Sequence, residues 1–213
     1  SWGGEVWMIP ETGQNNQIEL YKCVDFPGNW KLEKVLVKNT TASDVSIVFS
    51  EGYCWMITTT NGGAPPWKSF NKNMVIYVST ELTGEWHCIM EEDVFPCSRP
   101  AGNIFVHNEK LYRPTQQPHP KTGRYGWGIV FKEFTLDGEY REKLMHEKVE
   151  YSRIKPLWNH MLWGNHTFNF NDDFIVMDAK FKVDENGNFI RSKTFSSDEQ
   201  IDGDSGNDEG TMI

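Results

Sequence analysis

Cysteine motifs and long hydrophobic runs are missing from this chain. Its four cysteines are far apart and form no Cys-x-x-Cys pair, so the sequence has neither a zinc-finger pattern nor a redox dithiol. No stretch is long and apolar enough to predict a transmembrane helix, and no signal-peptide pattern is present. Phosphate-binding loops, dinucleotide fingerprints and nucleophile motifs are also missing. The sequence therefore predicts no nucleotide-dependent or thiol-dependent chemistry, and it assigns no compartment.

Positive charge is also scarce. The chain has 21 Lys and Arg against 30 Asp and Glu, which gives a formal net charge of −9. Six acidic residues and no Lys or Arg follow Lys193, so the preceding residues carry a net charge of −3. Neither part is basic, and we predict no nucleic-acid partner. Residues 197–213 are acidic and nearly devoid of hydrophobic side chains, and we predict a disordered tail there.

Short aromatic and β-branched segments make up most of the remaining chain. Each is closed by a turn signal such as Gly28-Asn29, which is typical of all-β proteins. The sequence Gly-x-x-Trp-Met-Ile occurs at residues 4–9 and again at residues 52–57, with a looser copy at residues 109–114. A period of about 50 residues with about four strands is that of a β-propeller blade. Only residues 140–150 show a weak helical period.

These cycles predict one all-β domain over residues 1–196, a β-propeller of which the chain supplies about three and a half blades. The first strand of a cycle would line the central channel. We place such inner strands at Asp44–Phe49, Ala101–Phe105 and His166–Phe170. A closed ring needs at least four blades, so we expect the missing blades to precede this chain or to come from a partner chain.

Two Arg-Pro pairs flank a predicted turn at residues 107–109. Arg99-Pro100 precedes the turn, and Arg113-Pro114 follows it. Proline cannot donate to a sheet ladder and belongs at strand starts, edges or bulges. We predict that the two guanidinium groups face a shared polar cavity. The alternative is that both are solvated or paired with surface acids.

Several longer motifs resemble one known family. They are Val6-Trp7-Met8-Ile9-Pro10-Glu11-Thr12, Ser98-Arg99-Pro100-Ala101-Gly102-Asn103-Ile104-Phe105 and Gly164-Asn165-His166-Thr167. The pattern is similar to that of the propeller domain at the N-terminus of plant glucosamine inositolphosphorylceramide transferases and of bacterial proteins beside formyltransferase-like domains. That domain is similar in turn to the arabinanase, β-xylosidase, invertase and levansucrase propellers. The resemblance implies a five-bladed propeller whose earlier blades precede Trp2.

The resemblance also implies catalytic candidates. In the related hydrolases, acids begin the first three inner strands, and Arg and His come from the last two. By cycle order, Asp44 begins the third inner strand, Arg99 the fourth and His166 the fifth. Asp44 and Glu11 are the predicted catalytic carboxylates, because glycoside hydrolysis uses one protonated carboxyl and one carboxylate. The hydrolase residue matching Asp44 is usually the longer Glu, and this departure favours binding over hydrolysis.

Polar and aromatic residues around the same funnel are the predicted sugar-binding positions. They are Arg99, Asn103, Arg113, His166, Asn16, Trp67 and Trp163. We expect no cofactor and no dedicated metal site, although the related propellers leave room for a structural ion in the central channel.

Three functions fit these observations. The first is a propeller acting on a glycosidic bond, and the second is a glycan-binding module without a full acid pair. The third is a propeller for protein interaction or scaffolding within a larger glycosyltransferase-type protein. Propellers host all three, so the fold does not choose among them. The predicted partner is a glycan or a sugar-containing small molecule.

Overall fold

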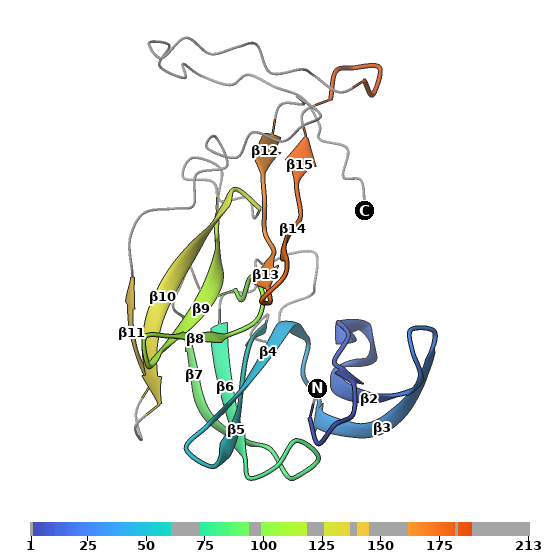
Figure 1. Cartoon of the computed structure of the whole chain (residues 1–213), viewed down its shortest axis with the longest axis vertical. Coiled ribbons are helices and arrows are strands. Elements are labelled where there is room, and N and C mark those ends of the chain that lie inside the picture. Colours follow the sequence, from blue (N-terminus) through green and yellow to red (C-terminus); the bar gives the residue numbers. More distant parts are fainter. Residues whose placement is uncertain are drawn as a thin grey trace.

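The computed structural model describes residues 2–60, 73–93, 99–118, 126–136, 140–144, 162–181 and 183–188. In this part of the chain nearly all regular structure is antiparallel β-sheet, and strands that follow one another in sequence lie side by side (Figure 1). The predicted tail over residues 197–213 lies outside the described residues. Within them, no helix has the length and apolarity needed to cross a membrane.

The first sheet has three strands in the order β1-β2-β3. They are β1 (Trp7–Met8), β2 (Gln17–Asp25) and β3 (Asn29–Lys38). A short 3-10 turn, η1 (Gly13–Asn15), lies between β1 and β2.

The second sheet is a four-stranded meander in the order β4-β5-β6-β7. Its strands are β4 (Ala42–Ser50), β5 (Tyr53–Thr60), β6 (Asn73–Ser79) and β7 (His87–Asp93). Glu51 and Gly52 join β4 to β5 and both have positive φ, 52° and 82°. Two such residues between paired strands make the tight turn whose twist matches a β-hairpin.

The third sheet is also a four-stranded meander, in the order β8-β9-β10-β11. Its strands are β8 (Phe105–His107), β9 (Lys110–Gln117), β10 (Gly128–Leu136) and β11 (Tyr140–Leu144). The predicted turn at residues 107–109 is confirmed, with Asn108 and Glu109 as its two central residues. The weak helix prediction over residues 140–150 was wrong for its first part, because residues 140–144 form a strand that pairs with β10.

The last described strands form two short ladders. In one ladder β12 (Leu162–Gly164) pairs with β15 (Lys180–Phe181), and in the other β13 (Phe168–Phe170) pairs with β14 (Ile175–Met177).

The sheets are stacked face to face, and strand alternation explains how. In β5, Cys54 and Met56 belong to the core shared with Ile18 and Leu20 of the first sheet. Trp55 and Ile57 point the other way and belong to the core shared with the third sheet. Because β5 is buried on both faces, it forms a nearly continuous apolar run. The second sheet is therefore sandwiched between its two neighbours, as blades of a propeller are.

The first strands of the second and third sheets lie toward the middle of the molecule. β4 and β8 are edge strands of their sheets, and Figure 1 places them with β13 near the centre of the view. The predicted inner strand at Asp44–Phe49 is confirmed as part of β4. The predicted strand at Ala101–Phe105 was shifted, because the regular strand begins at Phe105. Gly102 has φ of 137° and interrupts the pairing, and only an isolated bridge from Pro100 to Thr115 precedes it.

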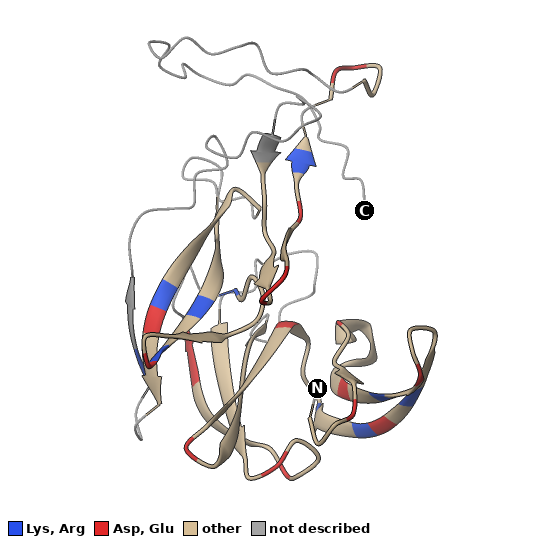
Figure 2. Cartoon of the chain, in the orientation of Figure 1, with Lys and Arg blue, Asp and Glu red and all other residues tan. Residues whose placement is uncertain are grey.

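Charged residues of both signs are interspersed over the described strands (Figure 2). Lys residues flank Glu33 along β3, and Lys132 and Glu133 are neighbours in β10.

Candidate functional site

The three inner segments meet around Gly102. The Ser46 hydroxyl of β4 donates to the Gly102 carbonyl at 2.8 Å, and the Phe168 N–H of β13 donates to the Ala101 carbonyl at 2.7 Å. A Cβ on Gly102 would lie 1.9 Å from the Phe168 carbonyl oxygen. Only glycine permits this approach, because both the φ angle and the contact exclude a side chain. The glycine thus brings the starts of β4, β8 and β13 together.

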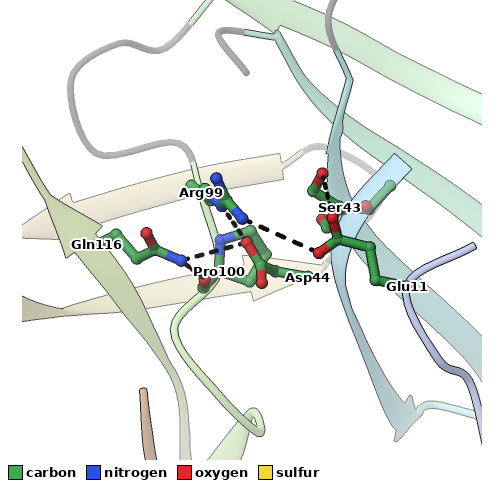
Figure 3. A network of polar contacts seen from close by, with 7 residues as sticks. Glu11, Ser43, Asp44, Arg99, Pro100 and Gln116 are labelled. Atoms are coloured by element: carbon green, nitrogen blue, oxygen red, sulfur yellow. Dashed lines mark hydrogen bonds and ion pairs between the residues drawn. The ribbon is translucent and has the colours of Figure 1, made fainter. Parts of the chain in front are cut away.

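Arg99 lies just before this junction and pairs with Asp44. The Arg99 Nε donates to Asp44 Oδ2, and a second guanidinium nitrogen lies 4.0 Å from Glu11 Oε2 (Figure 3). The side chains of Arg99 and Asp44 are 24% and 28% exposed, whereas that of Glu11 is 55% exposed. The structure therefore brings together three of the predicted site residues, and it leaves Glu11 the most accessible.

A β-bulge positions Asp44. The register shifts between Ser43 and Ser46, so two residues of β4 stand opposite one residue of β5. Asp44 has φ of 53°, in the left-handed region that residues other than glycine rarely adopt. Bulges re-aim side chains, and backbone strain of this kind is concentrated at functional sites. In this chain the bulge directs Asp44 toward Arg99.

Gln116 completes the group, and sequence reasoning did not select it. Its Nε2 donates to Asp44 Oδ2 at 3.2 Å and to the Pro100 carbonyl at 3.0 Å. The backbone N–H of Gln116 donates to the Arg99 carbonyl at 2.9 Å, which ties β9 to the Arg99 segment. Ser43 donates to Glu11 Oε1 at 3.5 Å. We call Glu11, Ser43, Asp44, Arg99 and Gln116 the Arg99 cluster (Figure 3).

Glu19 anchors the segment that carries Glu11. It is 3% exposed, and it accepts hydrogen bonds from Asn15 at 2.9 Å, from Gln17 at 2.5 Å and from the Tyr21 hydroxyl at 2.6 Å. The bonds from Tyr21, Gln17 and Asn15 lower the pKa of Glu19. A signal was present in the sequence, since Gln17, Glu19 and Tyr21 alternate on one face of β2.

His166 belongs to a separate pair. Its Nδ1 contacts Asp178 Oδ2, and the His166 N–H donates to Asp178 Oδ1 at 2.8 Å. Burial raises the pKa of Asp178, but the hydrogen bonds from His166 and from the Thr167 N–H outweigh burial, and the net pKa is lowered. The sequence offered no spacing signal for this pair, because its members are twelve positions apart and a hairpin lies between them.

The remaining predicted binding residues are scattered. Arg113 is 1% exposed within the third sheet, so it does not face open solvent beside Arg99. Asn103 is exposed, and its backbone N–H donates to Asn169 Oδ1 at 2.9 Å. Asn16 is an exposed left-handed residue that ends η1, with φ of 56°.

The side chains of the two predicted sugar-stacking tryptophans lie outside the described part of the structure. Trp67 lies outside the described residues, and Trp163 is described only through its backbone in β12. Within the described ranges, no three His, Cys, Asp or Glu side chains are grouped as metal ligands.

Comparison with known proteins identifies relatives by sequence. A family model described as "Glucosamine inositolphosphorylceramide transferase 1, N-terminal" matches residues 1–171. The glucosamine inositolphosphorylceramide transferase 1 of Arabidopsis thaliana is 31% identical over 165 residues, which cover 75% of this chain and 21% of that protein. The protein of the same name from Oryza sativa subsp. japonica is 28% identical, covering 74% of this chain and 21% of its own length. The chain thus spans about a fifth of the length of these relatives.

Solved structures identify the fold. The Bacteroides ovatus xyloglucan PUL protein GH43B has a TM-score of 0.52 at 15% identity, covering 92% of this chain and 40% of that one. The endo-arabinase of Bacteroides thetaiotaomicron has a TM-score of 0.51 at 15% identity, covering 90% of this chain and 76% of that one. Both are β-propellers, and this chain has the same all-β propeller fold. Five blades are compatible with it, and the blade number stays a prediction.

Proposed function

The chain belongs to the family of the N-terminal region of glucosamine inositolphosphorylceramide transferase 1, and from this premise we propose that it is a glycan-binding propeller. The ligand would bind at the Arg99 cluster. One observation carries the proposal: segments far apart in sequence converge on one partly exposed polar group. Glu11 precedes η1, Asp44 lies in β4, Arg99 precedes β8 and Gln116 lies near the end of β9.

The chemistry of the cluster suits a sugar. Carbohydrate hydroxyls donate and accept hydrogen bonds, and carboxylate, guanidinium and amide groups offer both partners in fixed geometry. The relatives are named for a sugar, as glucosamine inositolphosphorylceramide transferases, which supports a carbohydrate over a protein ligand. Scaffolding alone would not require the strained bulge at Asp44.

Binding is favoured over hydrolysis by the state of Asp44. A glycosidase needs two carboxyl groups directed at the scissile bond from opposite sides of the sugar. Asp44 Oδ2 instead accepts hydrogen bonds from both Arg99 and Gln116. One of the two predicted catalytic carboxylates is thereby engaged within the protein.

A glycan array probed with the full chain tests this proposal. We expect binding to a limited set of glycans, and we expect Arg99→Ala to reduce the signal at least about tenfold, because the guanidinium that holds the Asp44 and Glu11 carboxylates in place is lost. The control is Arg141→Ala, which removes an exposed guanidinium from β11. Equal loss in both variants, or no glycan bound by the wild-type chain, would contradict the proposal.

A reducing-sugar assay on the glycans that bind separates binding from hydrolysis. We expect no turnover. Turnover abolished by Asp44→Asn would establish the hydrolase instead.

A further inference from the structure

We infer that the Arg99 cluster selects sugars that present hydrogen-bond donors, ammonium groups above hydroxyls, and that it discriminates against sugars bearing a carboxylate or phosphate. The inference rests on the proposed function, and it names the chemical class of ligand for the same site. It follows from two observations: the donors of the cluster bond to acceptors within the protein, and some of its acceptors have no donor.

The donors of the cluster are directed at the protein's own oxygens. Arg99 donates to Asp44 and faces Glu11, and Ser43 donates to Glu11. The Gln116 side-chain nitrogen donates two hydrogen bonds, and both go to acceptors within the protein, Asp44 and the Pro100 carbonyl. An anionic ligand group would have to compete with two internal carboxylates for the same guanidinium.

The acceptors of the cluster are less fully used. Gln116 is 3% exposed, and its Oε1 has no hydrogen-bond partner. The two acceptors at Nε2 fix the orientation of this amide, so Oε1 must point away from Asp44, as Figure 3 shows. A buried acceptor without a donor is costly, and a group that donates to it is stabilising.

Glu11 supplies the second open acceptor. Its side chain is 55% exposed, and its contacts with Arg99 at 4.0 Å and Ser43 at 3.5 Å are long. An ionised carboxylate accepts at about four lone-pair sites, so most of this capacity is available to a ligand.

The formal charge of the cluster points the same way. Glu11 and Asp44 contribute two negative charges, and Arg99 contributes one positive charge, which leaves the group negative. Opposite charges about 4 Å apart attract by about 1 kcal/mol even at the dielectric constant of water, which corresponds to about a fivefold change in affinity. A cationic sugar gains this attraction, and an anionic sugar meets repulsion.

Two pairs of monosaccharides test the inference with the full chain. Glucosamine and N-acetylglucosamine differ in the charge at one position, and glucuronate replaces the terminal hydroxymethyl group of glucose with a carboxylate. Dissociation constants are measured by NMR titration at about pH 6, where the amine is protonated. We expect glucosamine to bind about fivefold tighter than N-acetylglucosamine, and glucuronate about fivefold weaker than glucose.

Glu11→Gln assigns the effect to the cluster. In this variant the two sugars of each pair should bind with nearly equal dissociation constants. Glu33→Gln, at an exposed position of β3, should leave both ratios of dissociation constants unchanged. If the sugars bind but the ratios are near one or reversed, the inference is wrong and the proposed function stands. If neither these sugars nor any arrayed glycan binds, the proposed function fails, and the inference fails with it.

Discussion

At the scale of single residues, the His166–Asp178 pair links the last described ladders through a charged contact. The carboxylate of Asp178 receives two backbone N–H groups and the His166 ring. Such a carboxylate is held in its ionised form by its donors, and its lowered pKa makes folding depend on pH.

We predict that Asp178 stabilises the fold above the pKa of an unfolded Asp and that this contribution is lost as pH falls through the lowered folded pKa. The sign follows because the unfolded chain binds the proton more readily. Urea unfolding at a series of acidic pH values should show a shallower pH dependence for Asp178→Asn than for the wild type. Asp172→Asn, at an exposed position, serves as the control. An unchanged pH dependence in Asp178→Asn would contradict the assignment.

Two Asn-x-Thr glycosylation sequons, Asn39-Thr40-Thr41 and Asn165-His166-Thr167, differ in burial. Asn39 is exposed on the turn after β3, whereas Asn165 is 2% exposed. If the chain is produced through a secretory pathway, we expect Asn39 to be modified and Asn165 to remain unmodified, because the attached glycan needs solvent. Peptide mass spectrometry of the secreted protein reads both sites, and full occupancy at Asn165 would contradict its burial.

At the scale of elements, Gly102 is the position on which the meeting of the inner strands depends. Its φ of 137° and the close Phe168 carbonyl both exclude a side chain. Gly52 also has positive φ, 82°, but it has open space around a Cβ. Comparing substitutions at the two glycines therefore distinguishes the cost of backbone strain alone from the cost of strain plus steric contact.

We expect Gly102→Ala to lower the free energy of unfolding by about 3 kcal/mol or more, and Gly52→Ala by only about 1 kcal/mol. Only the first substitution forces β8 and β13 apart. Denaturant unfolding measures both values. Similar losses in the two variants would show that the contact with Phe168 does not hold the inner strands together.

The strands themselves were predictable, and the details of the site were not. The apolar run of β5 and the turn residues Glu51 and Gly52 carry local signals that do not depend on the rest of the chain. The pairing of Asp44 with Gln116 links positions 72 residues apart, and no local pattern encodes it. The bulge at Asp44 depends on tertiary contacts, and so does the break at Gly102 that moved β8 away from its predicted start.

Cycle counting located part of the site for a physical reason. Inner strands of a propeller begin at one end of the channel, so Asp44 and Arg99 were expected to meet. Arg113 was the weaker of the two predicted guanidinium sites, and in the structure its side chain is buried within the third sheet, where the residue is 1% exposed.

At the scale of the whole molecule, stability comes from sheets packed face to face. Met56 and Ile57 are neighbours in β5, and both are fully buried, but they belong to different cores. A sheet covered on one side only would leave one of them exposed.

We predict that Met56→Ala and Ile57→Ala each cost about 3 kcal/mol of unfolding free energy, because each leaves a cavity in a different core. Ile175→Ala, at a position 69% exposed on β14, should cost less than about 0.5 kcal/mol. Chemical denaturation gives the three values. A small effect of either core substitution would mean that one face of the second sheet is not packed.

The central claim is that a sugar binds at the Arg99 cluster, and side-chain NMR tests it directly. Titrating the full chain with glucosamine should shift the Gln116 side-chain amide signals and leave those of Asn188, in the exposed turn after β15, in place. Glu11→Gln should reduce the shift at the same glucosamine concentration, because it removes one negative charge and the most exposed acceptor of the cluster. Unmoved Gln116 signals during a titration in which the sugar binds would contradict the account, because they would place the ligand elsewhere on the propeller.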